Sequence, residues 1–331
     1  MSLNQNIKNY SLTPYVTTPP EVYFLHHSIS NYCTVSIDRI TISGKFHAEQ
    51  YRTKLKENHW RESSRQLDGH PKSFELDRVD KNGEITTIAN ILRNPNFKPN
   101  SWRIDTSNHI RTPQEKQCIS NVIALFDKPH VTRLDIAVDF INWEHAGMRQ
   151  KMLKPNTAVT IEYGKAGNIE TIYCGKRKSN LQYRYYDKKL ERKQKKKKSI
   201  NNISNWERLE LQLRSSKYAS NWQKQAMRML DYFKRPNLTT IAETNPKSYL
   251  MLAGIVEHPE IFKLLTKRTK AKYRKMIKDN QGFDTTLADR ARKELTTSID
   301  RINQEISVFF EGCKQTKKIK YHKDTRPDKN N

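Results

Sequence analysis

Residues 133–140 alternate between polar and apolar side chains, with Ala137 as the one exception. The apolar members are Leu134, Ile136, Val138 and Phe140. Because successive side chains of a β-strand point to opposite faces, this alternation predicts a strand with one face in a core and one polar face. The same pattern recurs in Ser101–Thr106, Gln182–Lys188 and Trp206–Arg214. If these strands are neighbours in one sheet, their polar faces form a single surface.

Two further segments add strands to this set. Val35–Ser43 alternates with one break in phase near Asp38, and a β-bulge would absorb that break. Ser73–Val79 and Glu84–Ala89 flank the dipeptide Asn82-Gly83, which is typical of a tight two-residue hairpin turn. The N-terminal two thirds of the chain is therefore expected to be rich in antiparallel strands.

Helical signals interrupt and then follow the strands. Thr112, Pro113 and Glu115 are typical of a helix start. From Lys217 onward the spacing is helical, and the apolar stripe over 287–309 suits packing on the body or on a partner helix. The expected class is α+β: a mostly antiparallel sheet domain with flanking helices, then a helical C-terminal region. The expected regions are a flexible arm over 1–34, the α+β domain over 35–216, the helical region over 217–313 and a basic disordered tail over 314–331.

The charge balance favours a polyanionic partner. The chain has 61 Lys and Arg residues against 35 Asp and Glu residues, a formal net charge of +26. Such an excess indicates nucleic acid before other partners. Six of the seven residues in 192–198 are basic, as expected of an exposed loop, and residues 263–278 carry eight cations within a helical pattern.

Several classes of protein find no support in the sequence. It has neither a run of about 18 apolar residues, as a membrane span needs, nor the apolar core of a secretion signal. Its four cysteines are scattered, as in a reduced protein of the cytoplasm. It has no glycine-rich phosphate loop and no paired-histidine metal motif. We expect a cytoplasmic protein with no membrane partner and no nucleotide hydrolysis.

Carboxylates and a tyrosine share the predicted polar faces. The carboxylates are Asp105, Asp135, Asp139 and Glu210. A carboxylate cluster without His or Cys suits a hard cation such as Mg²⁺ or Mn²⁺. Tyr186 shares a strand face with Arg184 and Lys188, whose charges make a phenolate more accessible. This surface suits phosphodiester transesterification; the alternative is an ordinary solvated sheet face.

Four segments in this order resemble the replication initiation factors of small Gram-positive rolling-circle plasmids, the staphylococcal-type initiators, a family that includes relaxases of some conjugative elements. They are Val131–Phe140, Thr171–Ser179, Arg184–Arg192 and Trp206–Arg214. The resemblance runs from about Val35 to about Lys278. It implies an origin-specific DNA nickase and ligase, with the nicking domain in 35–216 and DNA binding and dimerisation in 217–313.

The resemblance also implies roles for individual residues. The family's active tyrosine lies in an Arg-x-Tyr-x-Lys motif, which matches Arg184, Tyr186 and Lys188, although Tyr183 and Tyr185 stand beside it here. It implies Asp135 and Glu210 as ligands of Mg²⁺ or Mn²⁺, with Asp105, Asp139 and Glu191 as further candidates at or around the metal. The residues expected to contact phosphate or DNA are Arg133, Arg177, Ser179, Arg208, Lys267, Arg268, Lys272, Arg274 and Lys275. Among these, Arg268 or Arg274 would read bases, because a guanidinium can pair with guanine through two hydrogen bonds.

The implied reaction begins with attack of Tyr186 on one strand of the origin. The protein becomes linked to the 5′ phosphate, the freed 3′ hydroxyl primes synthesis, and a second transfer later religates the strand. The implied partners are plasmid origin DNA, duplex and single-stranded, a host helicase and a second copy of the chain. Two alternatives stay open: a conjugative relaxase with the same chemistry, and a non-enzymatic basic nucleic-acid-binding protein that leaves no covalent adduct.

Overall fold

A computed structural model gives the fold. It describes residues 31–63, 73–80, 82–93, 100–107, 110, 112–143, 148, 150–195, 203–236, 239–257, 264–279 and 283–313. The expected tail over 314–331, the first thirty residues of the expected arm and residues 196–198 of the basic run lie outside these ranges.

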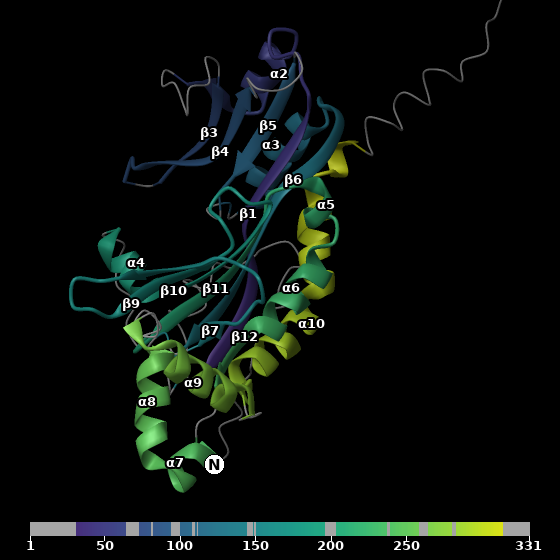
Figure 1. Ribbon diagram of the computed structural model, residues 1–331. Coiled ribbons are helices and arrows are strands. Elements are labelled where there is room, and N and C mark those ends of the chain that lie inside the picture. The colour runs from purple at the N-terminus through teal and green to yellow at the C-terminus, as the bar shows by residue number, and fades with distance from the viewer. Residues whose placement is uncertain are drawn as a thin grey trace, which may run out of the picture.

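One antiparallel sheet organises the described chain (Figure 1). Its ten strands run in the order β2-β3-β4-β5-β1-β6-β11-β10-β9-β8. They are β1 (Tyr32–Lys45), β2 (Trp60–Glu62), β3 (Ser73–Val79), β4 (Ile85–Arg93), β5 (Ser101–Thr106), β6 (Asp127–Ile141), β8 (Val159–Tyr163), β9 (Ile169–Cys174), β10 (Leu181–Asp187) and β11 (Trp206–Leu213). A smaller described sheet joins β7 (Lys151–Met152), β12 (Phe233–Pro236) and β13 (Phe283–Asp284).

The two longest strands of the large sheet, β1 and β6, lie side by side at its centre. In Figure 1 they run through both halves of the molecule, with β3, β4 and β5 around one end and β9, β10 and β11 around the other. The register between β1 and β6 shifts between Ile37 and Arg39, so the bulge expected near Asp38 is confirmed. A bulge re-aims the side chains around it, and here it brings Asp38 to the polar face of the sheet.

The hairpin of β3 and β4 is confirmed, but its turn is longer than expected. Asp80 donates its backbone N–H to Glu84 O, so three residues rather than two lie between the last paired positions. Gly83 takes a φ of 80°, a conformation that costs glycine little. The Asp80 carboxylate also accepts hydrogen bonds from the N–H groups of Asn82 and Glu84, which stabilises this longer turn.

The helices divide into two groups by what they pack against. They are α2 (Arg52–Glu57), α3 (Pro113–Ile123), α4 (Lys188–Gln194), α5 (Ser216–Ala219), α6 (Trp222–Tyr232), α7 (Thr239–Thr244), α8 (Pro246–Glu257), α9 (Lys267–Asp279) and α10 (Thr286–Val308). The α3 start is as expected: Thr112 and Glu115 form a reciprocal capping box. Helix α10 packs along β1, and its Leu295 and Ile302 are buried in the main core with Met229 of α6. The apolar stripe of the last helix therefore packs on the body.

Helices α7, α8 and α9 form a smaller unit with its own apolar cluster. Its buried members are Ile241, Leu252, Ile255 and Tyr273. The unit lies at the end of the molecule beyond β7 and β12 (Figure 1). The α+β class is confirmed. None of the described helices is long and apolar enough to cross a membrane, and the four cysteines are free thiols.

Candidate active site on the polar face of the sheet

Strand register brings the predicted site residues into neighbouring rows of one sheet face. Tyr186 of β10 pairs with Arg208 of β11, which pairs with Asp139 of β6. In the next row, Arg184 pairs with Glu210. The polar faces predicted separately for these three strands therefore form one surface, because β10, β11 and β6 are adjacent in the sheet.

Tyr186 is the phenol that this surface encloses. The guanidinium carbon of Arg184 lies 3.8 Å from the centre of the Tyr186 ring. Lys188 Nζ lies 3.5 Å from Tyr186 Oη, and the tyrosine is 2% exposed. Burial raises the pKa of the phenol well above its usual value, and the charge of Arg208 opposes that rise. Two cations at the ring and hydroxyl thus flank a largely desolvated phenol.

The other two tyrosines of β10 point to the opposite face. Tyr185 is buried and donates a hydrogen bond to Glu207. Tyr183 is buried in the main core. Strand alternation therefore separates Tyr186 from both neighbours, as the residue pattern predicted from the side chains it shares a face with.

Helix α4 begins directly after β10 and holds Lys188 over Tyr186. Asp187 caps the helix by accepting a hydrogen bond from Leu190 N at 2.8 Å. Glu191 Oε2 lies 2.6 Å from Lys188 Nζ, and its Oε1 lies 2.6 Å from Lys195 Nζ. Although burial opposes its charge, these two ammonium groups lower the pKa of Glu191 to about 2. Burial and the charge of Arg208 lower the pKa of Lys188, and the hydrogen bond and charge of Glu191 oppose that shift.

Arg208, predicted as a phosphate contact, lies between two carboxylates. Its Nε and Nη2 donate to the two oxygens of Asp139 at 2.7 and 2.9 Å, and its Nη1 donates to Asp38 Oδ1 at 2.6 Å. Trp206 Nε1 also donates to Asp139, at 2.6 Å. Asp139 is completely buried. The structure therefore places Arg208 and Asp139 in an internal ion pair in the same row of the sheet as Tyr186.

A group of carboxylates lies beside this row. Burial, together with the negative charges of Asp38 and Asp135, raises the pKa of Glu210 to about 7, while the hydrogen bond from Gln212 and the charge of Arg184 oppose the rise. Gln212 Nε2 donates to Glu210 at 2.5 Å. Arg133 Nη2 lies 2.5 Å from Asp135 Oδ2. The crowding of negative charge around Glu210 suits a bound cation, because a cation favours the ionised carboxylate.

The four predicted metal ligands do not gather at one point. Asp139 is paired with Arg208, and Asp105 accepts from Thr41 at 2.6 Å and lies 3.0 Å from Arg39. No group of three or more potential ligands set to hold a metal ion occurs among the described residues. Asp135 and Glu210 retain the oxygen chemistry that Mg²⁺ or Mn²⁺ prefers, and Asp38 is a third carboxylate near them that sequence reasoning did not assign.

Two predicted DNA-contacting groups lie away from this centre. Ser179 Oγ donates within its own turn, to carbonyls of Lys176 and Leu181 that both lie at 2.7 Å, while the Arg177 side chain is exposed. Helix α9 presents the predicted basic residues at its surface: Lys267, Arg268, Lys272, Arg274 and Lys275 are all exposed.

No role was assigned to Asp38 from the sequence, although its position at the break in phase of the first strand was visible.

The site is thus a buried tyrosine flanked by two cations on one face of an antiparallel sheet. Comparison with known proteins indicates the class of protein that carries it. Residues 129–278, which span β6 to α9, match the sequence model of the family described as "Replication initiation factor". This segment of the chain is similar to the replication initiation factors, which confirms the resemblance seen in the sequence.

Curated relatives carry the same description. A replication initiation protein of Staphylococcus aureus is 29% identical over 200 residues, which cover 57% of each chain, and a second is 29% identical over 177 residues, 50% of each. The match thus spans about half the length of these relatives. A solved structure of a rolling circle replication initiator protein from Geobacillus stearothermophilus aligns with a TM-score of 0.41 at 13% identity, over 68% of this chain and 97% of that one.

Proposed function

We propose that this protein is a rolling-circle plasmid replication initiator that nicks one strand of its origin with Tyr186 as the nucleophile and later religates it. The observation that carries the proposal is the environment of Tyr186, with Arg184 against its ring and Lys188 at its hydroxyl. The kinship with replication initiation factors supports DNA as the substrate.

The proposed reaction is a transesterification. Tyr186 Oη attacks the phosphorus, a tyrosyl–phosphate bond forms, and the bond from phosphorus to the 3′ oxygen breaks. The phenolic proton passes to water while the Lys188 ammonium stabilises the negative charge on Oη, and the departing oxygen takes a proton from water to become a 3′ hydroxyl. The phosphotyrosine keeps the bond energy, so the reverse attack by a 3′ hydroxyl closes the strand without an energy cofactor.

The side chains around Tyr186 supply positive charge close to the phenol. Arg184 Nε is buried and forms no hydrogen bond with the described residues, and an unsatisfied buried donor costs about 1–3 kcal/mol. A phosphate oxygen would satisfy it and gain a charge-assisted bond. The same guanidinium and Lys188 cover the phenol, so both must swing aside for DNA to reach it, as long side chains can.

We include Mg²⁺ or Mn²⁺ in the proposal, held by Asp135 and Glu210. Such an ion would neutralise charge on the phosphate as it gains a fifth oxygen. The fit rests on the chemistry of these carboxylates and on the raised pKa of Glu210. Origin duplex is assigned to the exposed cations of α9, and the proposal keeps a host helicase and a second copy of this chain as further partners.

A cleavage assay on supercoiled plasmid with the cognate origin tests the proposal. Wild type with Mg²⁺ or Mn²⁺ should give nicked plasmid and, on a denaturing gel, a protein–DNA adduct at the 5′ end. Tyr186→Phe should abolish both. Tyr183→Phe is the matched control, because it removes a phenol from the same strand whose side chain lies in the main core on the opposite face of the sheet. Intact DNA binding with no adduct from wild type would replace the enzyme by a non-enzymatic DNA-binding protein.

A further inference from the structure

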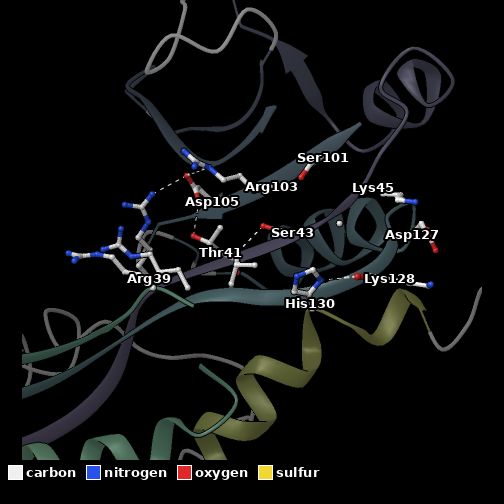
Figure 2. Close-up of a pocket in the computed structure, with 14 residues that line it drawn as sticks. Arg39, Thr41, Ser43, Lys45, Ser101, Arg103, Asp105, Asp127, Lys128 and His130 are labelled. Atoms are coloured by element: carbon white, nitrogen blue, oxygen red, sulfur yellow. Dashed lines mark hydrogen bonds and ion pairs between the residues drawn. The ribbon is translucent and has the colours of Figure 1, made fainter. Parts of the chain in front are cut away.

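A groove adjoins the candidate site on the same face of the sheet (Figure 2). It has a volume of about 640 Å³ and is lined by β1, β5, β6 and the residue that follows β11. Its permanently charged cations are Arg39, Lys45, Arg103, Lys128, Arg133 and Arg214. We call it the basic groove. Only two carboxylates, Asp105 and Asp127, face these six cations within its lining.

The carboxylate at the centre of the groove positions arginines. Asp105 accepts a hydrogen bond from Thr41 and lies 3.0 Å from Arg39 Nη2 and 3.3 Å from Arg103 Nε (Figure 2). Arg103 Nε is buried and makes no hydrogen bond with any described residue, because the contact to Asp105 lacks the required geometry. A guanidinium has five N–H donors, so both arginines keep donors for an anion.

Cations also crowd at the end of the groove nearest the site. Burial and the charge of Arg133 lower the pKa of the Arg214 guanidinium. An anion between these side chains would relieve their repulsion. Both the position of these cations around one groove and their excess over carboxylates therefore suit an anionic ligand.

The rest of the lining suits a phosphate backbone better than bases. Hydroxyls form the floor, where Ser43 Oγ lies 2.8 Å from Thr132 Oγ1. No Phe, Tyr or Trp belongs to the described lining, and base stacking on such rings is the usual way to hold unpaired bases. A ligand here would be held by its phosphates and sugars.

The groove leads along β6 toward Tyr186. Arg133 lines the groove and pairs with Asp135, and Asp139, further along the same strand, lies in the row of Tyr186. Six residues of strand separate Arg133 from Asp139, roughly 20 Å at about 3.3 Å per residue. At the 3.4 Å spacing of stacked nucleotides this distance covers about six nucleotides.

We propose that the basic groove binds the phosphates of single-stranded DNA that flanks the nick, up to about six nucleotides from the scissile bond. The inference rests on the proposed function for the meaning of the nick, while the binding itself is measured independently. The ligand class is a single-stranded polynucleotide, held through its backbone and without base preference.

Two exposed cations allow a clean test. Lys45→Gln with Lys128→Asn removes two charges without touching a described ion pair; asparagine is chosen because Lys128 has a φ of 51°, which asparagine tolerates. The control is Lys224→Gln with Lys293→Gln, which removes two exposed lysines from α6 and α10. All proteins carry Tyr186→Phe, so that only reversible binding is measured.

Fluorescence anisotropy with a labelled origin-strand oligonucleotide reads out the affinity over a range of salt concentrations. The groove variant should bind about tenfold more weakly than its parent, and its salt slope should fall by about 1.4, since each lost phosphate contact in a single strand accounts for about 0.7. The control should stay within about twofold of the parent. Oligonucleotides cut to fewer than about six nucleotides on the groove side should erase the difference.

Two results would overturn the inference: equal affinities for the groove variant and the control, or a loss confined to duplex DNA, which would make the groove a duplex site. A failure of the proposed function would be detected separately: wild-type protein, which keeps Tyr186, would form no covalent adduct with DNA. The two failures are thus measured in different assays, anisotropy for the groove and a denaturing gel for the adduct, and with different variants.

Discussion

The two ends of the polar sheet face differ in how their cations are matched. At the tyrosine end Arg208 is held by Asp38 and Asp139, and Lys188 by Glu191. In the basic groove six cations face the two carboxylates of the lining, Asp105 and Asp127, and Arg133 is also paired with Asp135. The groove thus keeps an excess of cations. Fixed, paired charges suit a reaction centre, because preorganised groups need not reorient as charge develops. Unmatched charges suit a ligand that brings its own negative charge.

Burial sharpens the contrast. The Arg208 side chain is 4% exposed, whereas Lys45 and Lys128 are exposed to solvent. Removing one partner of a buried ion pair leaves an uncompensated charge, while an exposed cation contributes little to stability. The tyrosine end should therefore be sensitive in both folding and activity, and the groove in binding alone.

The largest effect is expected from Arg208→Gln. The substitution leaves the buried Asp139 and the partly exposed Asp38 without their shared cation, which should lower the free energy of unfolding by about 3–5 kcal/mol. Urea denaturation at pH 7 measures it. Lys45→Gln is the comparison from the groove and should stay within about 0.5 kcal/mol of wild type. Similar stabilities for the two variants would contradict the division between the ends.

The second largest effect is a pH dependence of the free energy of unfolding, and it is expected from Glu210. An unfolded Glu has a pKa of about 4.3, and burial, with Asp38 and Asp135, raises that of Glu210 to about 7. Between these values the folded protein keeps a proton that the unfolded chain has lost, so this group's contribution to stability falls as pH rises from about 4.5 to about 7.

Glu210→Gln should remove that dependence. In metal-free buffer the variant should be more stable than wild type at pH 8, by an amount on the order of 3 kcal/mol, and similar to it near pH 4.5. Unfolding curves across this range measure the difference. Parallel curves for the two proteins would show that the carboxylate is ionised in the folded state over the whole range.

The sequence of each strand, taken alone, predicted which residues lie on the polar face of the sheet. Alternation along β10 placed Tyr186 on the same face as Arg184 and Lys188, and placed Tyr183 and Tyr185 on the opposite face. The reason is that face assignment depends only on position along one strand. The break in phase at Asp38 predicted the bulge for the same reason.

Cross-strand partners could not be predicted, because they depend on register and strand order. The sequence predicted Arg208 as a phosphate contact. In the structure it is paired with Asp38 and Asp139, which come from two other strands. The basic groove was missed because Lys45, Arg103 and Lys128 lie on three strands and none belongs to a basic run. Asp105 reads as a ligand, and its arginine partners appear only in the folded sheet.

A metal test separates the predicted carboxylates. Mn²⁺ at ten times its dissociation constant should stabilise wild type at pH 8 by about 1.4 kcal/mol, seen as a rise of a few degrees in Tm. Glu210→Gln or Asp135→Asn should remove the rise, and Asp105→Asn should keep it, because Asp105 holds arginines in the groove. A rise lost only in Asp105→Asn would move the metal to the groove end.

The smallest effect is expected at helix α9, which should bind duplex where the groove binds single strands. Lys275 is exposed on α9, and Lys275→Gln should reduce the salt slope for origin duplex by about 0.9, the share of one phosphate contact. The affinity of Lys275→Gln for single strands should not change. The groove variant should lose affinity for single strands and keep its affinity for duplex. Fluorescence anisotropy with duplex and single-stranded DNA measures both affinities for each of the two variants. If both variants lost both forms equally, the two surfaces would act as one undivided field of charge, and the distinction between a reading helix and a strand-guiding groove would fail.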